Sequence, residues 1–182
     1  MENQRIRLSK KMLKSALMEL LKKKPVEKIS IYELCETAQI NRTTFYKYYG
    51  NQYDLLSDIE NDIFEKFEEQ LRAYNDSSAH LHHVLDLILS DKENFITLIN
   101  SVPDQEFLDK LFSLHTVRAI LNAQFPEKYS ERQREYMYLF ICQGSYAIIR
   151  KWLNDGAQDS TEMVAELIHD LAGRTLIFQE EK

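Results

Sequence analysis

Residues that form tight turns are scarce in this chain, since four glycines and three prolines occur among 182 residues. Together they make about 4% of the sequence, whereas average proteins contain about 12%. Short β-hairpins depend on such residues, so few hairpins can form. Apolar residues recur instead three and four positions apart, which is the spacing of amphipathic helices. The sequence therefore predicts an all-α fold.

Capping residues and helical spacing divide the sequence into nine predicted helices. Ser30 precedes Glu33, and Ser130 precedes Gln133, at the spacing of a capping box, in which each side chain bonds the other residue's backbone amide. The predicted helices span residues 5–24, 30–37, 41–47, 52–74, 78–89, 90–100, 103–123, 130–154 and 159–178.

Composition excludes several classes of protein. With 44% hydrophobic and 29% charged residues, the chain has the composition of a folded protein. Cys35 and Cys142 are too few for a disulfide framework, and the first residues are charged rather than signal-like. The longest apolar stretch, residues 136–142, is far below the roughly 18 residues that cross a bilayer. We expect a cytoplasmic protein with no membrane partner.

Signatures of catalysis and of cofactor binding are missing from the sequence. It contains no glycine-rich phosphate loop and no nucleophile elbow, and four glycines leave little room for such loops. His80, His83 and Asp86 share a helical spacing that a metal could use, but a solvated helix start explains them more simply. We expect no enzyme activity, no cofactor and no metal.

The charge is distributed unevenly along the chain. Residues 1–50 carry eleven Lys and Arg against five Asp and Glu, a net +6, whereas residues 51–182 carry a net −12. A positive head on an acidic body indicates a unit that binds a polyanion. The alternative is that the lysines at 22–24 only form a solvated helix end. The change of sign predicts two domains, residues 1–50 and residues 51–182.

Two short predicted helices, residues 30–37 and 41–47, are separated by a three-residue turn, as in a helix-turn-helix. The second helix of that motif presents its first side chains to the major groove of DNA. Arg42 can pair with a guanine edge, Thr43 can contact a thymine methyl group, and Lys47 can reach a base or a phosphate. Thr44 and Tyr48 are placed for phosphates, which fix the register of the protein on DNA. An ordinary helical hairpin is the alternative.

This segment resembles the DNA-binding head of the TetR family of transcriptional regulators. The family pattern is carried here by Ser30, Ala38, Ile40, Tyr46 and Tyr49, followed by Leu55 and Leu56. The resemblance covers about residues 5–60. A weaker one, at Gly144, Ser145, Trp152 and Gly156, links the C-terminal region to the regulators of dihydroxyacetone-kinase operons. The family implies an all-α homodimer whose last two helices, residues 130–154 and 159–178, pair with their mates as a four-helix bundle.

The sequence departs from the family pattern at two positions. Gln39 replaces the usual turn glycine, so a non-glycine residue is expected in a left-handed conformation, at a cost of about 1 kcal/mol. Gln52 stands at the start of the next helix, where the family often has a lysine, and an uncharged residue there makes DNA binding less dependent on salt. The candidate DNA-binding residues are Ser30, Asn41, Arg42, Thr43, Thr44, Tyr46, Lys47, Tyr48 and Gln52.

These observations predict a homodimeric repressor that binds a palindromic operator in double-stranded DNA. The family implies that a small-molecule ligand enters the body, shifts the helix at residues 52–74 and releases the operator. Two alternatives stay open. One is an activator or co-activator of the same fold that works through a protein partner, and the other is an interaction module without DNA binding.

Overall fold

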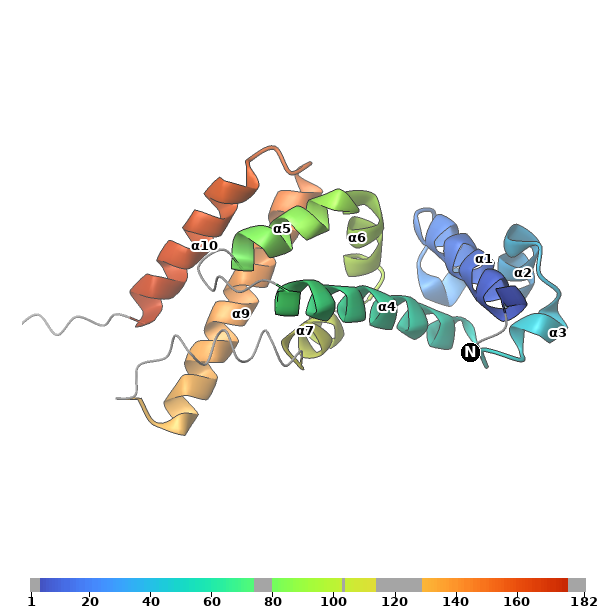
Figure 1. The fold of residues 1–182 in the computed structure, drawn as a ribbon, viewed down its shortest axis with the longest axis horizontal. Helices are drawn as coiled ribbons and strands as arrows, with labels where there is room; N and C mark the ends of the chain where they lie inside the picture. Colours follow the sequence, from blue (N-terminus) through green and yellow to red (C-terminus); the bar gives the residue numbers. More distant parts are fainter. Residues whose placement is uncertain (1–3, 74–79, 103, 114–128, 177–182) are drawn as a thin grey trace, which may run out of the picture. The chain divides into compact units, whose positions relative to one another are not determined.

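The computed structural model describes residues 4–73, 80–102, 104–113 and 129–176. Within these ranges the chain forms nine α-helices and no strand, so the predicted all-α fold is confirmed. The helices belong to two compact units, which we describe separately (Figure 1). The head unit comprises residues 1–65 and 93–102, and the body unit comprises residues 66–92 and 103–182.

The head unit is built around an amphipathic first helix, α1 (Gln4–Leu21). The apolar side chains of α1 that recur three and four positions apart are buried, including Leu13 and Leu17 at 0% exposure. Pro25, in an extended conformation, follows the end of α1 and precedes a short 3₁₀ turn, η1 (Val26–Lys28). The head unit also contains α2 (Ile31–Ala38), α3 (Arg42–Phe45), the first part of α4 (Gln52–Ala73) and most of α6 (Lys92–Ile99).

The body unit contains the rest of α4 together with α5 (His80–Ser90), α7 (Asp104–Ser113), α9 (Glu131–Asn154) and α10 (Thr161–Leu176). α10 packs against α9 and α5 (Figure 1). The predicted capping box of Ser130 and Gln133 starts α9. Trp152 Nε1 donates to the Asp159 carbonyl at 3.0 Å and so holds the turn between α9 and α10.

Polar side chains add a second connection within the body unit, between α5 and the start of α10. The Thr161 hydroxyl donates to Asp86 Oδ1 at 2.9 Å and lies 3.0 Å from His82 Nε2. His82 Nε2 also lies 3.2 Å from Glu162 Oε1. Among the described residues no group of three His, Cys, Asp or Glu could hold a metal ion. The side chain of His80, weighed above as a ligand, lies outside the described residues.

Most predicted helix bounds agree with the structure to within a few residues. The differences lie at helix ends: α1 stops at Leu21 instead of residue 24, and α3 stops at Phe45 instead of residue 47. α10 begins at Thr161 because the Ser160 hydroxyl accepts from the Met163 amide and caps the helix there. The predicted helical residues at 74, 78–79, 103, 114–123 and 177–178 lie outside the described residues.

Both cysteines are buried, at 3% exposure each. Burial raises the pKa of Cys142 to about 12. Burial also raises the pKa of Cys35, although the nearby Arg42 charge acts in the opposite direction. In the part of the chain that the structure describes, the helices are too short or too polar to cross a membrane.

Candidate nucleic-acid interface

The turn between α2 and α3 is closed by backbone hydrogen bonds around Gln39. The Ser30 hydroxyl caps the start of α2 by accepting from the Glu33 amide at 3.2 Å. At the other end Gln39 adopts φ 53° and ψ 38°, and the Ile40 amide donates to the Cys35 carbonyl at 3.0 Å. The prediction that a non-glycine residue takes the left-handed conformation here is confirmed.

Of the capping box predicted for Ser30 and Glu33, the structure contains the hydrogen bond from the Glu33 amide to the Ser30 hydroxyl. The Glu33 carboxylate accepts from Lys24 Nζ at 2.5 Å. This ion pair joins the loop after α1 to the first turn of α2, so Glu33 serves a longer-range contact than the one predicted. Ser30 itself is exposed.

The helix α3 presents polar side chains outward from a buried anchor. Asn41 Oδ1 accepts from the Thr43 amide at 2.8 Å and caps the helix. Phe45 is fully buried, and its ring contacts those of Tyr46 and Tyr49 with centroids 5.4 and 5.7 Å apart. The exposed candidates are Asn41, Arg42, Thr43, Tyr46 and Lys47, whereas Thr44 and Tyr48 are half-buried.

The start of α4 continues this stretch of polar residues. Asn51 Oδ1 accepts from the amides of Tyr53 and Asp54 at 2.8 and 3.0 Å, and Asp54 Oδ2 accepts from the Gly50 amide at 2.8 Å. Gln52, a candidate, is half-buried in the first turn of α4. Eight of the nine candidates therefore lie in one continuous stretch, residues 41–52, and Ser30 lies at the start of α2.

Tyr53, which is not among the nine predicted residues, is 49% exposed beside Gln52. Leu55 and Leu56 are the buried positions of the same turn and leave Tyr53 on the outer side. Exposed cations on α1 add positive charge to the head unit, namely Arg5, Arg7 and Lys11. Exposed cations and hydroxyls beside a helix that is capped by an asparagine side chain can bind phosphates and base edges.

A second surface lies on the body unit and is apolar. On α9 the exposed residues include Tyr136, Leu139 and Phe140, the last at 65% exposure. On α10 the exposed apolar residues are Met163, Leu167 and Leu171. A Cβ atom added at Gly144 of α9 would meet no atom within 4 Å, so this helix has room for a close neighbour. Apolar patches of this kind mark protein contacts.

Comparison with known proteins finds relatives of this chain. The family model TetR_C_8, a transcriptional regulator C-terminal region, matches residues 75–174, which is more than half of the chain. The uncharacterized HTH-type transcriptional regulator YxbF of Bacillus subtilis (strain 168) is 23% identical over 171 residues, which cover 89% of this chain and 44% of that protein. The HTH-type dhaKLM operon transcriptional activator DhaS of Lactococcus lactis subsp. lactis (strain IL1403) is 35% identical over 68 residues, which cover 37% of this chain and 36% of that protein. The chain therefore spans less than half the length of these two relatives.

Solved structures share this arrangement of helices. A TetR transcriptional regulator from Streptococcus agalactiae 2603V matches with a TM-score of 0.77 and 21% identity, over 93% of this chain and 96% of that one. A dihydroxyacetone kinase operon activator DhaS matches with a TM-score of 0.61 and 22% identity, over 92% and 96% of the two chains. At these identities the likeness establishes the fold.

Proposed function

The chain belongs to the TetR family of transcriptional regulators, and we propose that it is a homodimeric repressor that binds a specific operator in double-stranded DNA. The resemblance found in the sequence is confirmed, together with its relation to the dihydroxyacetone-kinase-operon regulators. Members of this family are regulators of transcription and not enzymes. A repressor of this kind acts in the cytoplasm, where it meets its operator.

One observation carries the DNA-binding proposal. Arg42, Thr43 and Lys47 lie exposed on a capped segment that the buried Phe45 anchors. Arg42 reads a guanine edge, Thr43 contacts a thymine methyl group, and Lys47 reaches a base or a phosphate. The half-buried candidates, Thr44 and Tyr48 among them, bond phosphates and set the register. Residues 1–50 are then the DNA-binding domain and residues 51–182 the regulatory and dimerisation domain.

The exposed apolar residues of α9 and α10 support dimerisation through these two helices. Phe140 of α9 and Leu167 of α10 are both exposed, and a twofold axis would bring the same residues of two subunits together. One recognition helix reads only a few base pairs, so two heads on half-sites about 34–36 Å apart double the sequence that is read.

Release by a small-molecule ligand is the regulatory part of the proposal. α4 contributes its first residues to the head unit and its last residues to the body unit, so a ligand that shifts α4 changes the placement of the head. Such a ligand must bind more tightly to the conformation with the wrong head spacing.

An activator is the second candidate function. The DhaS relative is described as an operon activator and is 35% identical over the matched 68 residues. An activator uses the same operator contacts but depends on a protein partner for its effect on transcription. In a reconstituted transcription assay, a repressor lowers the transcript from its own promoter, whereas an activator raises it.

Arg42→Ala tests the DNA-binding proposal most simply. We expect the variant to stay folded and to lose affinity for the duplexes that the wild type selects from a random 40-base-pair library. Lys151→Ala is the control, because Lys151 is an exposed cation of the body unit and its removal changes the net charge equally. Equal binding by the wild type and by Arg42→Ala would contradict the proposal and favour an interaction module.

A further inference from the structure

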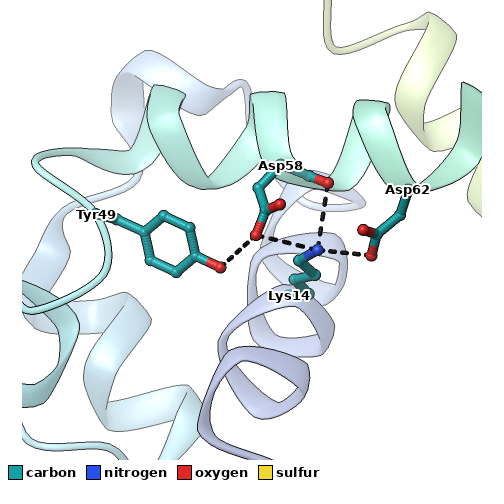
Figure 2. Close-up of polar contacts among 4 residues, drawn as sticks. All are labelled: Lys14, Tyr49, Asp58 and Asp62. Atoms are coloured by element: carbon teal, nitrogen blue, oxygen red, sulfur yellow. Dashed lines mark hydrogen bonds and ion pairs between the residues drawn. The ribbon is translucent and has the colours of Figure 1, made fainter. Parts of the chain in front are cut away.

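Four polar side chains from three segments of the head unit form one connected cluster (Figure 2). The Tyr49 hydroxyl donates to Asp58 Oδ2 at 2.6 Å. Lys14 Nζ lies 3.1 Å from the same Asp58 oxygen and 2.6 Å from Asp62 Oδ2. Lys14 Nζ also donates to the Asp58 carbonyl oxygen at 3.2 Å. Asp58 is therefore the residue of α4 at which the contacts from α1 and from the segment after α3 meet.

The position of Tyr49 makes this cluster relevant to the DNA-reading segment. Tyr49 lies four residues after Phe45, is only 6% exposed, and packs its ring against Phe45. The Tyr48 ring lies next to it, with centroids 6.4 Å apart. A displacement of Tyr49 from Asp58 would therefore displace the side chains that carry the proposed contacts with DNA.

Hydrogen bonds that involve a charged group are shorter and stronger than neutral ones, so they hold geometry tightly. The cluster contains a cation between two carboxylates, and Lys14 and Asp58 are each partly shielded from solvent. The apolar core of the head unit, with Leu13, Leu34 and Leu55 at 0% exposure, does not depend on these charges. Removal of one charge should therefore leave the head unit folded but less well oriented.

We propose that Asp58 is a positioning residue for DNA reading, which holds Tyr49 and Lys14 on α4 and so fixes the orientation of the recognition segment. This inference rests on the proposed function. It predicts that Asp58 affects recognition of the operator more than general attraction to DNA. Specific recognition needs side chains in register with the bases, whereas attraction to random DNA depends mainly on charge.

Asp58→Asn and Glu65→Gln form a matched pair of variants. Both replace a carboxylate of α4 by its neutral amide, and Glu65 is exposed. The loss of a negative charge by itself strengthens attraction to DNA in both variants. We expect Asp58→Asn to weaken operator binding about tenfold while its affinity for random duplex is unchanged or higher. Glu65→Gln should keep the wild-type ratio of operator to random affinity.

Two further variants separate the contacts of Asp58. Tyr49→Phe removes the hydroxyl and keeps the buried ring, so it should also lower the ratio of operator to random affinity. Asp62→Asn removes a contact of the more exposed carboxylate to Lys14 and leaves the bond between Tyr49 and Asp58, so its effect should be smaller. If Asp58→Asn lowers the melting temperature but keeps the wild-type ratio, Asp58 is only a stabilising residue and the inference is wrong.

Hydrogen exchange of the protein without DNA keeps this inference separate from the proposed function. In Asp58→Asn the amides of residues 42–49 should exchange faster than in the wild type, whereas Glu65→Gln should leave them unchanged. If the wild type selects no duplex, the proposed function fails, and the exchange rates still decide whether Asp58 holds the segment. Unchanged exchange at residues 42–49 in Asp58→Asn would overturn the inference.

Discussion

Gln39 occupies the turn of the helix-turn-helix with a backbone conformation that side chains usually avoid. Its φ of 53° lies in the left-handed region, where a Cβ atom crowds the following carbonyl oxygen. The cost is of the order of 1–2 kcal/mol for a residue other than glycine. Gln39 is exposed, so burial of its side chain offsets little of this cost. The turn geometry is therefore kept although the residue is unfavourable for it.

Gln39→Gly should stabilise the protein. Relief of the left-handed conformation gains more than the added flexibility of the unfolded chain loses, and we expect a net gain of about 0.5 kcal/mol in urea unfolding. Thr37→Gly is the control, because Thr37 is an exposed residue of α2 and glycine destabilises a helix. A loss of stability in Gln39→Gly similar to that in Thr37→Gly would show that the turn is not strained.

Arg42 and Tyr48 should affect DNA binding in different ways. Loss of a base contact in Arg42→Ala should cost about 1–3 kcal/mol on the operator and relax the preference at one base pair. Loss of a phosphate contact in Tyr48→Phe should weaken the operator and random DNA by the same factor. Titration of both duplexes at two salt concentrations measures these effects. The assignment of roles is wrong if Tyr48→Phe changes the base preference.

Residues whose contacts are local could be predicted from the sequence, whereas residues with distant partners could not. The cap at Asn41 and the strain at Gln39 were predictable because their partners lie within four residues along the chain. The partners of Asp58 are Tyr49, nine residues away, and Lys14, forty-four residues away, so local pattern gave no signal for them. For the same reason local pattern does not predict the ion pair of Glu33 with Lys24, because Lys24 lies outside the helix of Glu33.

At the scale of helices, the joint between α1 and α4 contains the charged contacts of Lys14 with Asp58 and Asp62. Burial disfavours the charged form of Asp58, but the hydrogen bonds from Tyr49 and Lys14 and the charges of Lys14 and Lys10 outweigh burial. The pKa of Asp58 is therefore below its usual value. A carboxylate with a depressed pKa in the folded state stabilises the fold above its unfolded pKa, near 3.9. This contribution is lost as the pH falls through the folded pKa.

The stability difference between the wild type and Asp58→Asn should follow this titration. We expect a constant difference in the free energy of unfolding from about pH 5 to pH 8, because Asp58 stays charged there. Below about pH 4 the difference should shrink as Asp58 takes up a proton. Urea unfolding across this range measures it. A difference that fades between pH 5 and pH 8 would mean that another group controls the joint.

Helix bounds show what the pattern of apolar residues predicts well and where it fails. The pattern predicted α4 and α9 closely, because a long buried stripe defines each helix. It extended α3 to residue 47, although the helix ends at Phe45 and residues 46–48 form a turn. A helix this short has too few apolar positions to mark its end, so capping contacts decide it.

At the scale of the molecule, the proposed function requires two heads held by one dimer. The exposed apolar residues of α9 and α10 supply a face that suits a second copy of the chain. The net charges of residues 1–50 and 51–182, +6 and −12, fit this plan, because a basic head attracts a polyanion and an acidic body repels it. Whether the body takes a ligand or a protein partner was not predictable from the sequence, because apolar pocket residues follow the same pattern as core residues.

Phe140→Asp should convert the dimer to a monomer. A charge placed on the apolar face must be desolvated in the dimer, so we expect monomers in light scattering and a steep loss of operator affinity. Leu8→Asp is the control for oligomeric state, since Leu8 is an exposed apolar residue of α1. A Phe140→Asp protein that remains a dimer would place the dimer interface elsewhere.

Selection of DNA by the wild-type protein tests whether this chain recognises a specific operator. The protein is incubated with fragments of its own genome at about 150 mM salt, and the bound fragments are sequenced. We expect enrichment of a short inverted repeat with half-sites about one helical turn apart, and loss of this enrichment in Arg42→Ala. A folded, dimeric protein that enriches no sequence would contradict this expectation.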